Sequence, residues 1–193
     1  MTPATVPAEK ARIREEVRKR LEKVSVQDRA NAAVRVCELL ASQLVWQKAA
    51  SVLLYAPTPD ELDIWCVGEL ALRQGKLLAL PLYVPSNDCY GARQIEDLQQ
   101  DLGVGRYGIR EPRSSCKTVT LKQLDLILVP GVAFDLRGRR LGRGKGYYDR
   151  LLAAIRGHKC GVAFDEQIVL RVPVEPHDSD VNWILTPTRW IEL

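Results

Sequence analysis

Hydrophobic residues recur at helical intervals in the first part of the chain. Four of them, spaced four, four and three positions apart, share one face of a helix that we predict over residues 8–23. The segment 25–28 then has the pattern of a capping box, and it predicts the start of a second helix that extends to about Val45. The residues of the first hydrophobic stripe are Ile13, Val17, Leu21 and Val24.

Short runs of β-favouring residues alternate with a helical segment farther along. Residues 51–55 predict a first buried strand, residues 61–73 a helix that ends at Gly75, and residues 76–82 a second buried strand. A strand, a helix and another strand joined by short connections indicate a right-handed βαβ unit. We therefore expect a parallel sheet.

The second half of the chain resumes this alternation after a less regular stretch. Residues 83–115, with short segments at 90–95 and 104–109, suggest a small hairpin-like insertion beside the main sheet. Further strands are expected at 124–129, 159–164 and 181–186, and a helix at 146–155.

The composition is that of a globular domain. The chain has 193 residues, of which 46% are hydrophobic and 27% charged, and this length can bury about 70% of the surface of the unfolded chain. We expect a single domain over residues 1–193, with a flexible tail at 1–7. No run of about 18 apolar residues suggests a membrane span, and the N-terminus has no apolar signal-peptide core.

Cysteine usage and charge narrow the classes of function. The five cysteines, an odd number without a C-x-x-C pair, argue against a disulfide framework or a zinc site and favour a reducing, cytoplasmic location. The net charge is only +4, and the excess gathers near the N-terminus and in one central loop. Local basicity suits a small polyanion better than a long duplex, so we expect neither a nucleic-acid nor a membrane partner.

A basic, glycine-rich loop follows the strand predicted at 124–129. Residues 137–145 contain five cations and three glycines. Glycines let backbone N–H groups approach a ligand, and a helix that starts near Gly146 would add its positive dipole end, so the loop favours phosphate. An ordinary solvated loop is the alternative. The spacing excludes two known phosphate motifs, because Arg139 replaces the first glycine of a Walker A motif and Tyr147 the third glycine of a Rossmann fingerprint.

The same loop carries a resemblance to a known family. The Pro-Gly at 130–131, the Phe-Asp at 134–135 and the run RLGRGKGYYD at 140–149 resemble the signature of 5-formyltetrahydrofolate cyclo-ligases, also called methenyltetrahydrofolate synthetases. The resemblance implies an α/β fold, a three-layer α/β/α sandwich around a mostly parallel, Rossmann-like sheet. It also implies a monomeric enzyme that uses ATP and Mg²⁺ to convert 5-formyltetrahydrofolate to 5,10-methenyltetrahydrofolate, ADP and phosphate, through a phosphorylated formyl intermediate.

The resemblance further implies roles for residues outside the loop. Lys10 and Arg14, one helical turn apart, would contact the nucleotide phosphates; a solvated helix face is the alternative explanation of their spacing. Glu61 would contact the folate, or would instead close a capping box that begins at Thr58. Tyr107 would stack on the pterin ring, or would lie partly buried in a turn.

Most of the implied site belongs to the loop itself. Asp149 and Asp178 would hold Mg²⁺ together with nucleotide oxygens and water, although Asp178 alone would suggest an ordinary surface turn. A non-catalytic member that binds folate or nucleic acid through the same loop is the alternative function. The catalytic candidates are Lys145, Tyr147 and Arg143; the ATP candidates in the loop are Arg140, Gly142, Arg143, Gly144, Lys145, Gly146, Tyr147 and Tyr148; those for folate are Arg143, Gly144, Lys145, Gly146 and Tyr147.

Overall fold

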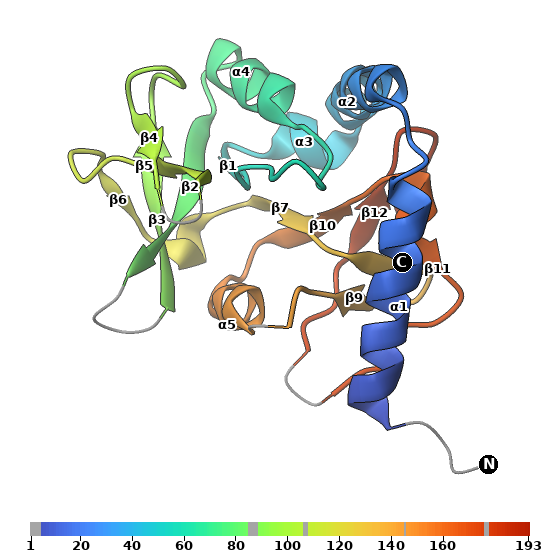
Figure 1. The fold of residues 1–193 in the computed structure, drawn as a ribbon. Helices are drawn as coiled ribbons and strands as arrows, with labels where there is room; N and C mark the ends of the chain where they lie inside the picture. Colours follow the sequence, from blue (N-terminus) through green and yellow to red (C-terminus); the bar gives the residue numbers. More distant parts are fainter. Residues whose placement is uncertain (1–4, 85–88, 106–107, 145, 176–177) are drawn as a thin grey trace.

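A computed structural model describes residues 5–84, 89–105, 108–144, 146–175 and 178–193 of the chain. Eight strands of these residues form one sheet, in the order β13-β12-β10-β7-β1-β2-β3-β6 (Figure 1). Its five consecutive central strands are mutually parallel, as the βαβ pattern predicts. They are β12 (Trp183–Leu185), β10 (His158–Val162), β7 (Leu126–Pro130), β1 (Ser51–Leu53) and β2 (Leu77–Val84).

Antiparallel strands extend the sheet at both edges. The segment predicted at 90–95 is one of them, and it therefore belongs to the main sheet rather than to an insertion beside it. The reason is that β2 is eight residues long, and its seven residues from Leu78 onward each have a partner in β3. The antiparallel strands are β13 (Trp190–Glu192), β3 (Cys89–Ile95) and β6 (Thr118–Val119), of which β13 and β6 lie at the two edges.

Two smaller sheets lie beside the main one. In the first, β4 and β5 pair antiparallel, and a turn that contains Gly108 at φ 73° splits the run expected as one segment at 104–109. In the second, β8 lies between β11 and β9. These strands are β4 (Leu102–Val104), β5 (Arg110–Pro112), β8 (Ala133–Asp135), β9 (Arg140–Leu141) and β11 (Ile168–Val169).

Successive residues of the central strands face opposite sides of the sheet. Val52 and Leu54 belong to one buried hydrophobic cluster, whereas Leu53 belongs to another. In β7, Leu128 and Ile127 divide between the two clusters in the same way. Strands that are hydrophobic on both faces require cover on both faces.

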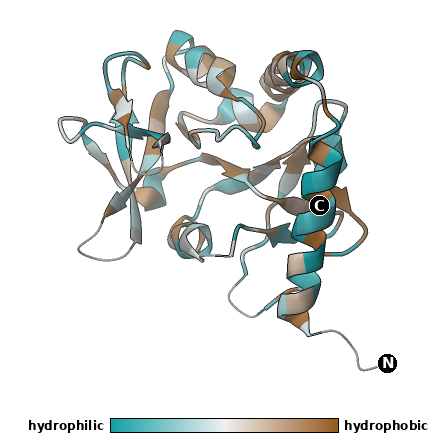
Figure 2. Ribbon diagram, viewed as in Figure 1, coloured by the Kyte–Doolittle hydropathy of each residue, from teal (hydrophilic) through white to brown (hydrophobic). Residues whose placement is uncertain are grey.

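Helices provide this cover and confirm the predicted three-layer fold. Helices α1, α2 and α4 contribute to the first cluster and α5 to the second; Figure 1 shows α2, α3 and α4 on one side of the sheet and α5 on the other. In Figure 2 the helices alternate between hydrophobic and hydrophilic colours. No helix in the described ranges combines the length and apolar character of a membrane span. The helices are α1 (Val6–Leu21), α2 (Val26–Ala41), α3 (Leu44–Lys48), α4 (Trp65–Arg73) and α5 (Tyr147–Ala154), with 3₁₀ turns at Leu121–Gln123 and Asp165–Gln167.

Two helix ends differ from the sequence-based prediction. Helix α1 begins at Val6, inside the tail expected at 1–7. Helix α2 ends at Ala41, earlier than expected, and the separate helix α3 follows. The Ser42 hydroxyl donates to the Leu39 carbonyl oxygen at 2.8 Å. This side-chain bond competes with the backbone for a carbonyl group of the last helical turn, which explains the break.

The helix predicted at 61–73 begins only at Trp65. The capping-box geometry is partly present, because the Thr58 N–H donates to Glu61 Oε2 and the Glu61 N–H donates to the Thr58 carbonyl oxygen, both at 2.9 Å. These bonds close a turn that does not continue as a helix. At the actual start of α4, the Asp63 carboxylate accepts a hydrogen bond from the Trp65 N–H at 2.9 Å. Asp63 precedes the N-cap residue Ile64, which makes no side-chain cap hydrogen bond, and it satisfies the N–H of the first helical residue instead.

Candidate active site

The predicted site residues gather where the order of the parallel strands reverses. From β1 the chain continues to β2 on one side, whereas the later strand β7 lies on the other side of β1. The segments that follow β1 and β7, residues 54–64 and 131–144, therefore leave neighbouring carboxyl ends of the sheet; the second of them includes β8 and β9. In open α/β sheets, ligands bind in the crevice at such a reversal.

A buried carboxylate shapes the first half of the loop after β7. Asp135 is fully buried, and its Oδ1 accepts hydrogen bonds from the N–H groups of Arg137 and Arg139 at 2.9 and 3.2 Å. Its Oδ2 accepts from the Val172 N–H at 2.9 Å. Gly138 has φ 82°, and a Cβ there would meet a backbone oxygen at 2.7 Å. The turn is therefore fixed by one carboxylate and by a residue that must be glycine.

Arg140 is buried between the loop and helix α5. Its Nη1 donates to the Pro130 carbonyl oxygen at 3.2 Å, and its Nη2 pairs with Asp149 Oδ1. The guanidinium carbon also lies 5.9 Å from the centroid of the Tyr148 ring. Its Nε has no hydrogen-bond partner among the described residues. An expected ATP ligand and an expected Mg²⁺ ligand thus form an ion pair in this structure.

Lys10 reaches from α1 to the segment that precedes β12. Its Nζ lies 2.7 Å from Asp178 Oδ2 and 2.8 Å from Glu175 Oε2, and only 8% of its side chain is exposed. Burial by itself would lower the pKa of Lys10. The hydrogen bonds and charges of Asp178 and Glu175 together outweigh burial, so the pKa of Lys10 is raised. Lys10 is therefore a charged, buried ammonium group held by two carboxylates.

Arg14 packs one turn farther along α1, against the glycines of the loop. Its Nε donates to the Gly142 carbonyl oxygen at 3.0 Å. Gly144 has φ 93°, and a Cβ at this position would lie 3.3 Å from Arg14 Nη2. The glycine therefore serves both the backbone conformation and the close approach of the guanidinium group.

The same residues line a cavity of about 220 Å³ between α1, the loop and the segment around 175–178. Cations, glycine backbone and carboxylates face each other across it, which is the composition of a site for a phosphate group and its counter-ion. Seven predicted site residues line it: Lys10, Arg14, Gly142, Gly144, Gly146, Asp149 and Asp178. Glu175, which we did not predict, lines it as well.

Arg143 connects the loop to the turn after β1. Its Nη2 donates to Thr58 Oγ1 at 2.6 Å and lies 3.3 Å from Glu61 Oε1. The other carboxylate oxygen of Glu61 accepts the hydrogen bond of the turn described above. Two roles were considered for Glu61, a cap of the turn that begins at Thr58 and a contact with the folate. They are compatible in part, because one carboxylate oxygen closes the turn and the other faces the basic loop. Arg143 itself is about half exposed, with 53% of its side chain accessible.

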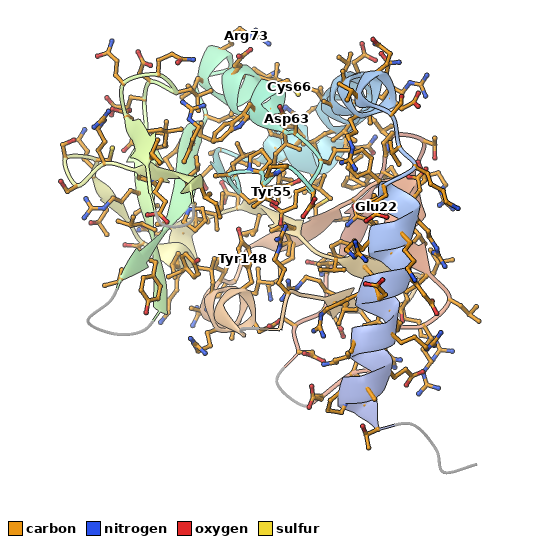
Figure 3. The ribbon with its side chains drawn as sticks, viewed as in Figure 1. Glu22, Tyr55, Asp63, Cys66, Arg73 and Tyr148 are labelled. Atoms are coloured by element: carbon orange, nitrogen blue, oxygen red, sulfur yellow. The ribbon has the colours of Figure 1, made fainter. Side chains whose placement is uncertain are left out.

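Tyrosines form an aromatic wall next to these residues. The Tyr148 ring lies 6.1 Å from Tyr90, which in turn lies 5.8 Å from Tyr83 (centroid distances). Burial, followed by the negative charge of Glu61, raises the pKa of Tyr148. Figure 3 labels Tyr148 on α5 and Tyr55 in the segment after β1. The Tyr55 hydroxyl donates to a backbone carbonyl at 2.9 Å, so its polar end is satisfied.

The sequence analysis missed three residues of the site, namely Tyr83, Tyr90 and Glu175. Tyr83 and Tyr90 are direct partners across β2 and β3, and the turn-forming Pro-Ser-Asn-Asp at 85–88 was the signal that could have paired them. Glu175 gave no comparable signal, because its role depends on a lysine 165 positions away.

Some predicted residues lie outside the described part of the chain. Lys145 and Tyr107 belong to the segments that are not described, and for Tyr147 only the backbone, at the start of α5, is described. Their roles stay predictions.

The described residues could supply only part of the ligand shell of a magnesium ion. No group of three or more His, Cys, Asp or Glu side chains gathers to hold a metal within the described ranges. Asp149 and Asp178 line the same cavity, but each already pairs with a cation, Arg140 and Lys10 respectively. Mg²⁺ commonly takes one or two carboxylates and completes its shell with phosphate oxygens and water. The pair therefore fits an ion that arrives with a nucleotide.

The fold and the site define an α/β protein with a glycine-rich, cation-lined cavity, whose described lining comes from α1, the segment after β7, the start of α5 and the segment before β12. The profile of the 5-formyltetrahydrofolate cyclo-ligase family matches residues 6–187. The 5-formyltetrahydrofolate cyclo-ligase of Mus musculus is 28% identical over 197 residues, covering 96% of this chain and 97% of the mouse protein. That of Escherichia coli K12 is 34% identical over 149 residues, covering 73% of this chain and 80% of its own length.

Solved structures agree with these sequence relationships. The solution structure of Aquifex aeolicus 5,10-methenyltetrahydrofolate synthetase superposes with a TM-score of 0.86 at 36% identity, and it covers 95% of this chain and 92% of that one. The chain therefore belongs to the 5-formyltetrahydrofolate cyclo-ligase family, and it is an enzyme.

Proposed function

We propose that this enzyme converts 5-formyltetrahydrofolate to 5,10-methenyltetrahydrofolate, with conversion of ATP to ADP and phosphate. The observation that supports it most directly is the convergence of the glycine-rich loop with Lys10 and Arg14 around one polar cavity. One wall of this cavity, which includes Gly142 and Gly144, belongs to the segment that follows β7, and β7 is one of the two strands at the strand-order reversal, where α/β enzymes bind their ligands. The names of the mouse and Escherichia coli relatives supply the folate substrate.

The proposed chemistry explains why the site contains cations rather than a nucleophile. The formyl oxygen is a poor leaving group, so the γ-phosphoryl group of ATP is first transferred to it. N10 of the folate then attacks the activated carbon, the ring closes, N10 loses its proton, and phosphate departs with the former formyl oxygen. Phosphoryl transfer depends mainly on positioning and on stabilising negative charge.

The phosphates would bind at the start of α5. Gly146 caps this helix in the left-handed conformation, with φ 66° and no side-chain hydrogen bond at the cap. The first N–H groups of α5 therefore have no side-chain acceptor at this cap, and a helix N-terminus favours an anion. Arg14 approaches Gly142 and Gly144, which precede this helix. We assign the phosphates to this region, with Arg140, Lys145 and the backbone at Tyr147 and Tyr148 completing it.

The cavity has room for only part of an ATP molecule. Sites for drug-sized ligands usually enclose about 300–1,000 Å³, whereas this cavity encloses about 220 Å³. It can hold part of the triphosphate but not a whole nucleotide. The rest of the nucleotide would extend beyond the cavity, and the triphosphate would replace the contacts of Lys10 with Asp178 and Glu175.

The folate would bind on the opposite side of the loop. Arg143 and Glu61 meet there, and the ring of Tyr148 continues through Tyr90 into the edge of the sheet. A flat pterin gains contact area from such an aromatic wall. We propose that Glu61 orients the pterin, and that Arg143, Lys145 and Tyr147 lie between formyl group and γ-phosphate as the catalytic residues, with Gly144 and Gly146 allowing close approach.

Magnesium would neutralise the triphosphate and orient its γ-phosphoryl group. Asp149 and Asp178 are the proposed protein ligands, because both face the cavity. Their present partners, Arg140 and Lys10, are then available to the phosphate oxygens. A single rearrangement would thus exchange two protein ion pairs for contacts with MgATP.

The test is to mix the purified enzyme with 5-formyltetrahydrofolate and MgATP and to follow the near-ultraviolet absorbance of the methenyl product. A signal that requires both ATP and magnesium is expected. Folate binding without turnover would contradict the proposal and favour the non-catalytic alternative. ATP hydrolysis that is indifferent to folate would point to another substrate.

Other properties stay predictions from the sequence and the family resemblance. A monomer is expected in sedimentation experiments. A cytoplasmic location is expected from fractionation of the host cell. A salt-sensitive shift of RNA would contradict the expectation that no nucleic acid binds.

A further inference from the structure

Helices α2 and α4 bring two thiols together, away from the cavity. The Cys66 Sγ, in the first turn of α4, donates a hydrogen bond to the Ala33 carbonyl oxygen of α2 at 3.4 Å. Figure 3 shows Cys66 on the side of α4 that faces α2. Cys37 follows Ala33 by four residues, and a helical carbonyl points toward the N–H group four positions on. The Cys66 sulfur therefore lies over the turn that carries Cys37.

The two thiols interact and differ in acidity. The neighbouring Cys66 thiol lowers the pKa of Cys37; burial opposes this, Arg73 adds to the lowering, and Glu38 and Glu69 counteract it. The neighbouring Cys37 thiol, followed by burial, raises the pKa of Cys66. Cys37 is thus the better thiolate, and Cys66 holds the proton. Both side chains are half-buried rather than enclosed in the core.

We propose that Cys37 and Cys66 form a redox-active pair that closes to a disulfide when the enzyme meets hydrogen peroxide. The Cys37 thiolate attacks one peroxide oxygen, which leaves a sulfenic acid on Cys37 and, after uptake of a proton, releases water. Cys66 then loses its proton and attacks the Cys37 sulfur, and a second water departs. In total the two thiols are oxidised by loss of two hydrogen atoms, and the peroxide is reduced to two waters.

The disulfide would connect two helices that cover the same face of the sheet. It would tie α2 to the first turn of α4, directly after the loop 54–64 that carries Glu61. Closing the loop over residues 37–66 removes conformational entropy from the unfolded chain, so the thermal midpoint should rise by about 5 °C or more. The bond would also restrain the end of the loop at the strand-order reversal.

Peptide mapping tests this pairing. The full chain is treated with hydrogen peroxide, alkylated and digested without reductant, and mass spectrometry then searches for a linked Cys37–Cys66 peptide. The linked peptide is expected in the wild type and in Cys116→Ser, and it should vanish in Cys37→Ser and Cys66→Ser. Cys116 is a matched control, because its thiol also donates to a backbone carbonyl, that of Asp101, at 3.5 Å.

Two further results would overturn the pairing. One is sulfinic or sulfonic acid on Cys37 without any linked peptide; the other is a set of linked peptides spread indiscriminately over the cysteines.

A zinc test and a melting test are independent of these peptide maps. If Zn²⁺ protects both thiols from alkylation while peroxide gives no link, the pair is a metal site and the proposal fails. Melting curves of oxidised and reduced wild type need no variant, and an unchanged midpoint would contradict the proposed restraint. None of these measurements depends on folate or ATP.

Discussion

The Nζ of Lys10 lies 2.7 Å from Asp178 Oδ2, although 168 positions separate the two residues in the chain. One was expected to bind phosphate and the other magnesium, and in the structure they neutralise each other. The same holds for Arg140 and Asp149. A cavity with balanced charge can stay closed without a ligand. MgATP carries both an anion and a cation, so it can replace both partners at once.

Replacing Lys10 with methionine should destabilise the enzyme. The variant leaves Asp178 without its buried cation, and breaking a buried ion pair usually costs 3–5 kcal/mol, which we reduce to about 2–3 kcal/mol because the Glu175 side chain is partly exposed. The check is the free energy of unfolding in urea. Lys10→Arg retains the charge and should lose less. Equal stability of Lys10→Met and wild type would show that the pair contributes nothing.

The contribution of Lys10 should depend on pH with a defined sign. Its folded-state pKa is raised, so its stabilisation is fully present below the pKa of the unfolded chain and is lost as pH rises through the folded value. The difference in unfolding free energy between wild type and Lys10→Met should therefore stay constant from neutral pH to roughly pH 10 and shrink beyond it. A difference that grows at alkaline pH would contradict the raised pKa.

The parallel sheet could be predicted because its signals are local. Residues 51–55, 76–82 and 124–129 are apolar runs of strand length, and each lies at or within a few residues of an observed strand. Buried strands of parallel sheets are hydrophobic on both faces, so continuous runs identify them without long-range information. The glycines of the loop could also be recognised, because Gly144 and Gly146 have positive φ values that other residues rarely adopt.

The partners of the charged residues could not be predicted. The spacing of Lys10 and Arg14 placed both on one helix face, but no local pattern tells which carboxylates meet them. Glu175 was missed for this reason, since its contact with Lys10 requires α1 to pack against the segment that precedes β12. The turn at 58–61 shows a second limit: a capping pattern fixes a turn, whereas tertiary contacts decide whether a helix continues from it.

Gly144→Ala should impair the site more than the fold. Its φ of 93° strains any side chain, and the added Cβ would lie 3.3 Å from Arg14 Nη2. Gly75→Ala is the matched control, because Gly75 also has a positive φ, 69°, but nothing within 4 Å of the added Cβ. Both variants should lose about 1 kcal/mol of stability. Only Gly144→Ala should lower kcat/KM. A similar loss of kcat/KM in both variants would contradict the proposed role of the contact between residue 144 and Arg14.

Lys145→Ala should lower turnover by at least about tenfold, which corresponds to roughly 1.4 kcal/mol of transition-state stabilisation. The physical reason is the loss of a cation beside the transferred phosphoryl group. Arg137→Ala removes an exposed cation from the same loop and should leave turnover near that of the wild type. Steady-state kinetics of the two variants test the proposed role of Lys145. Near-normal kcat/KM in Lys145→Ala, or an equal loss in Arg137→Ala, would remove Lys145 from the phosphate role.

Asp149→Asn should raise the magnesium concentration that half-maximal activity requires. The amide keeps the shape of the side chain but lacks the charge that attracts the ion. The same change also weakens the ion pair with buried Arg140, so some loss of stability is expected whatever the role in metal binding. Activity must therefore be measured as a function of Mg²⁺ concentration, well below the unfolding temperature of the variant.

A structural role alone would give a different result from metal binding by Asp149. If Asp149 only holds Arg140 in place, Asp149→Asn should lower kcat at every magnesium concentration without moving the midpoint of the Mg²⁺ titration. If it binds the ion, the midpoint should move, and Asp178→Asn should move it in the same direction, because both carboxylates line the cavity. An unchanged midpoint in both variants would place the ion on the nucleotide and water alone, and the two aspartates would remain partners of Arg140 and Lys10.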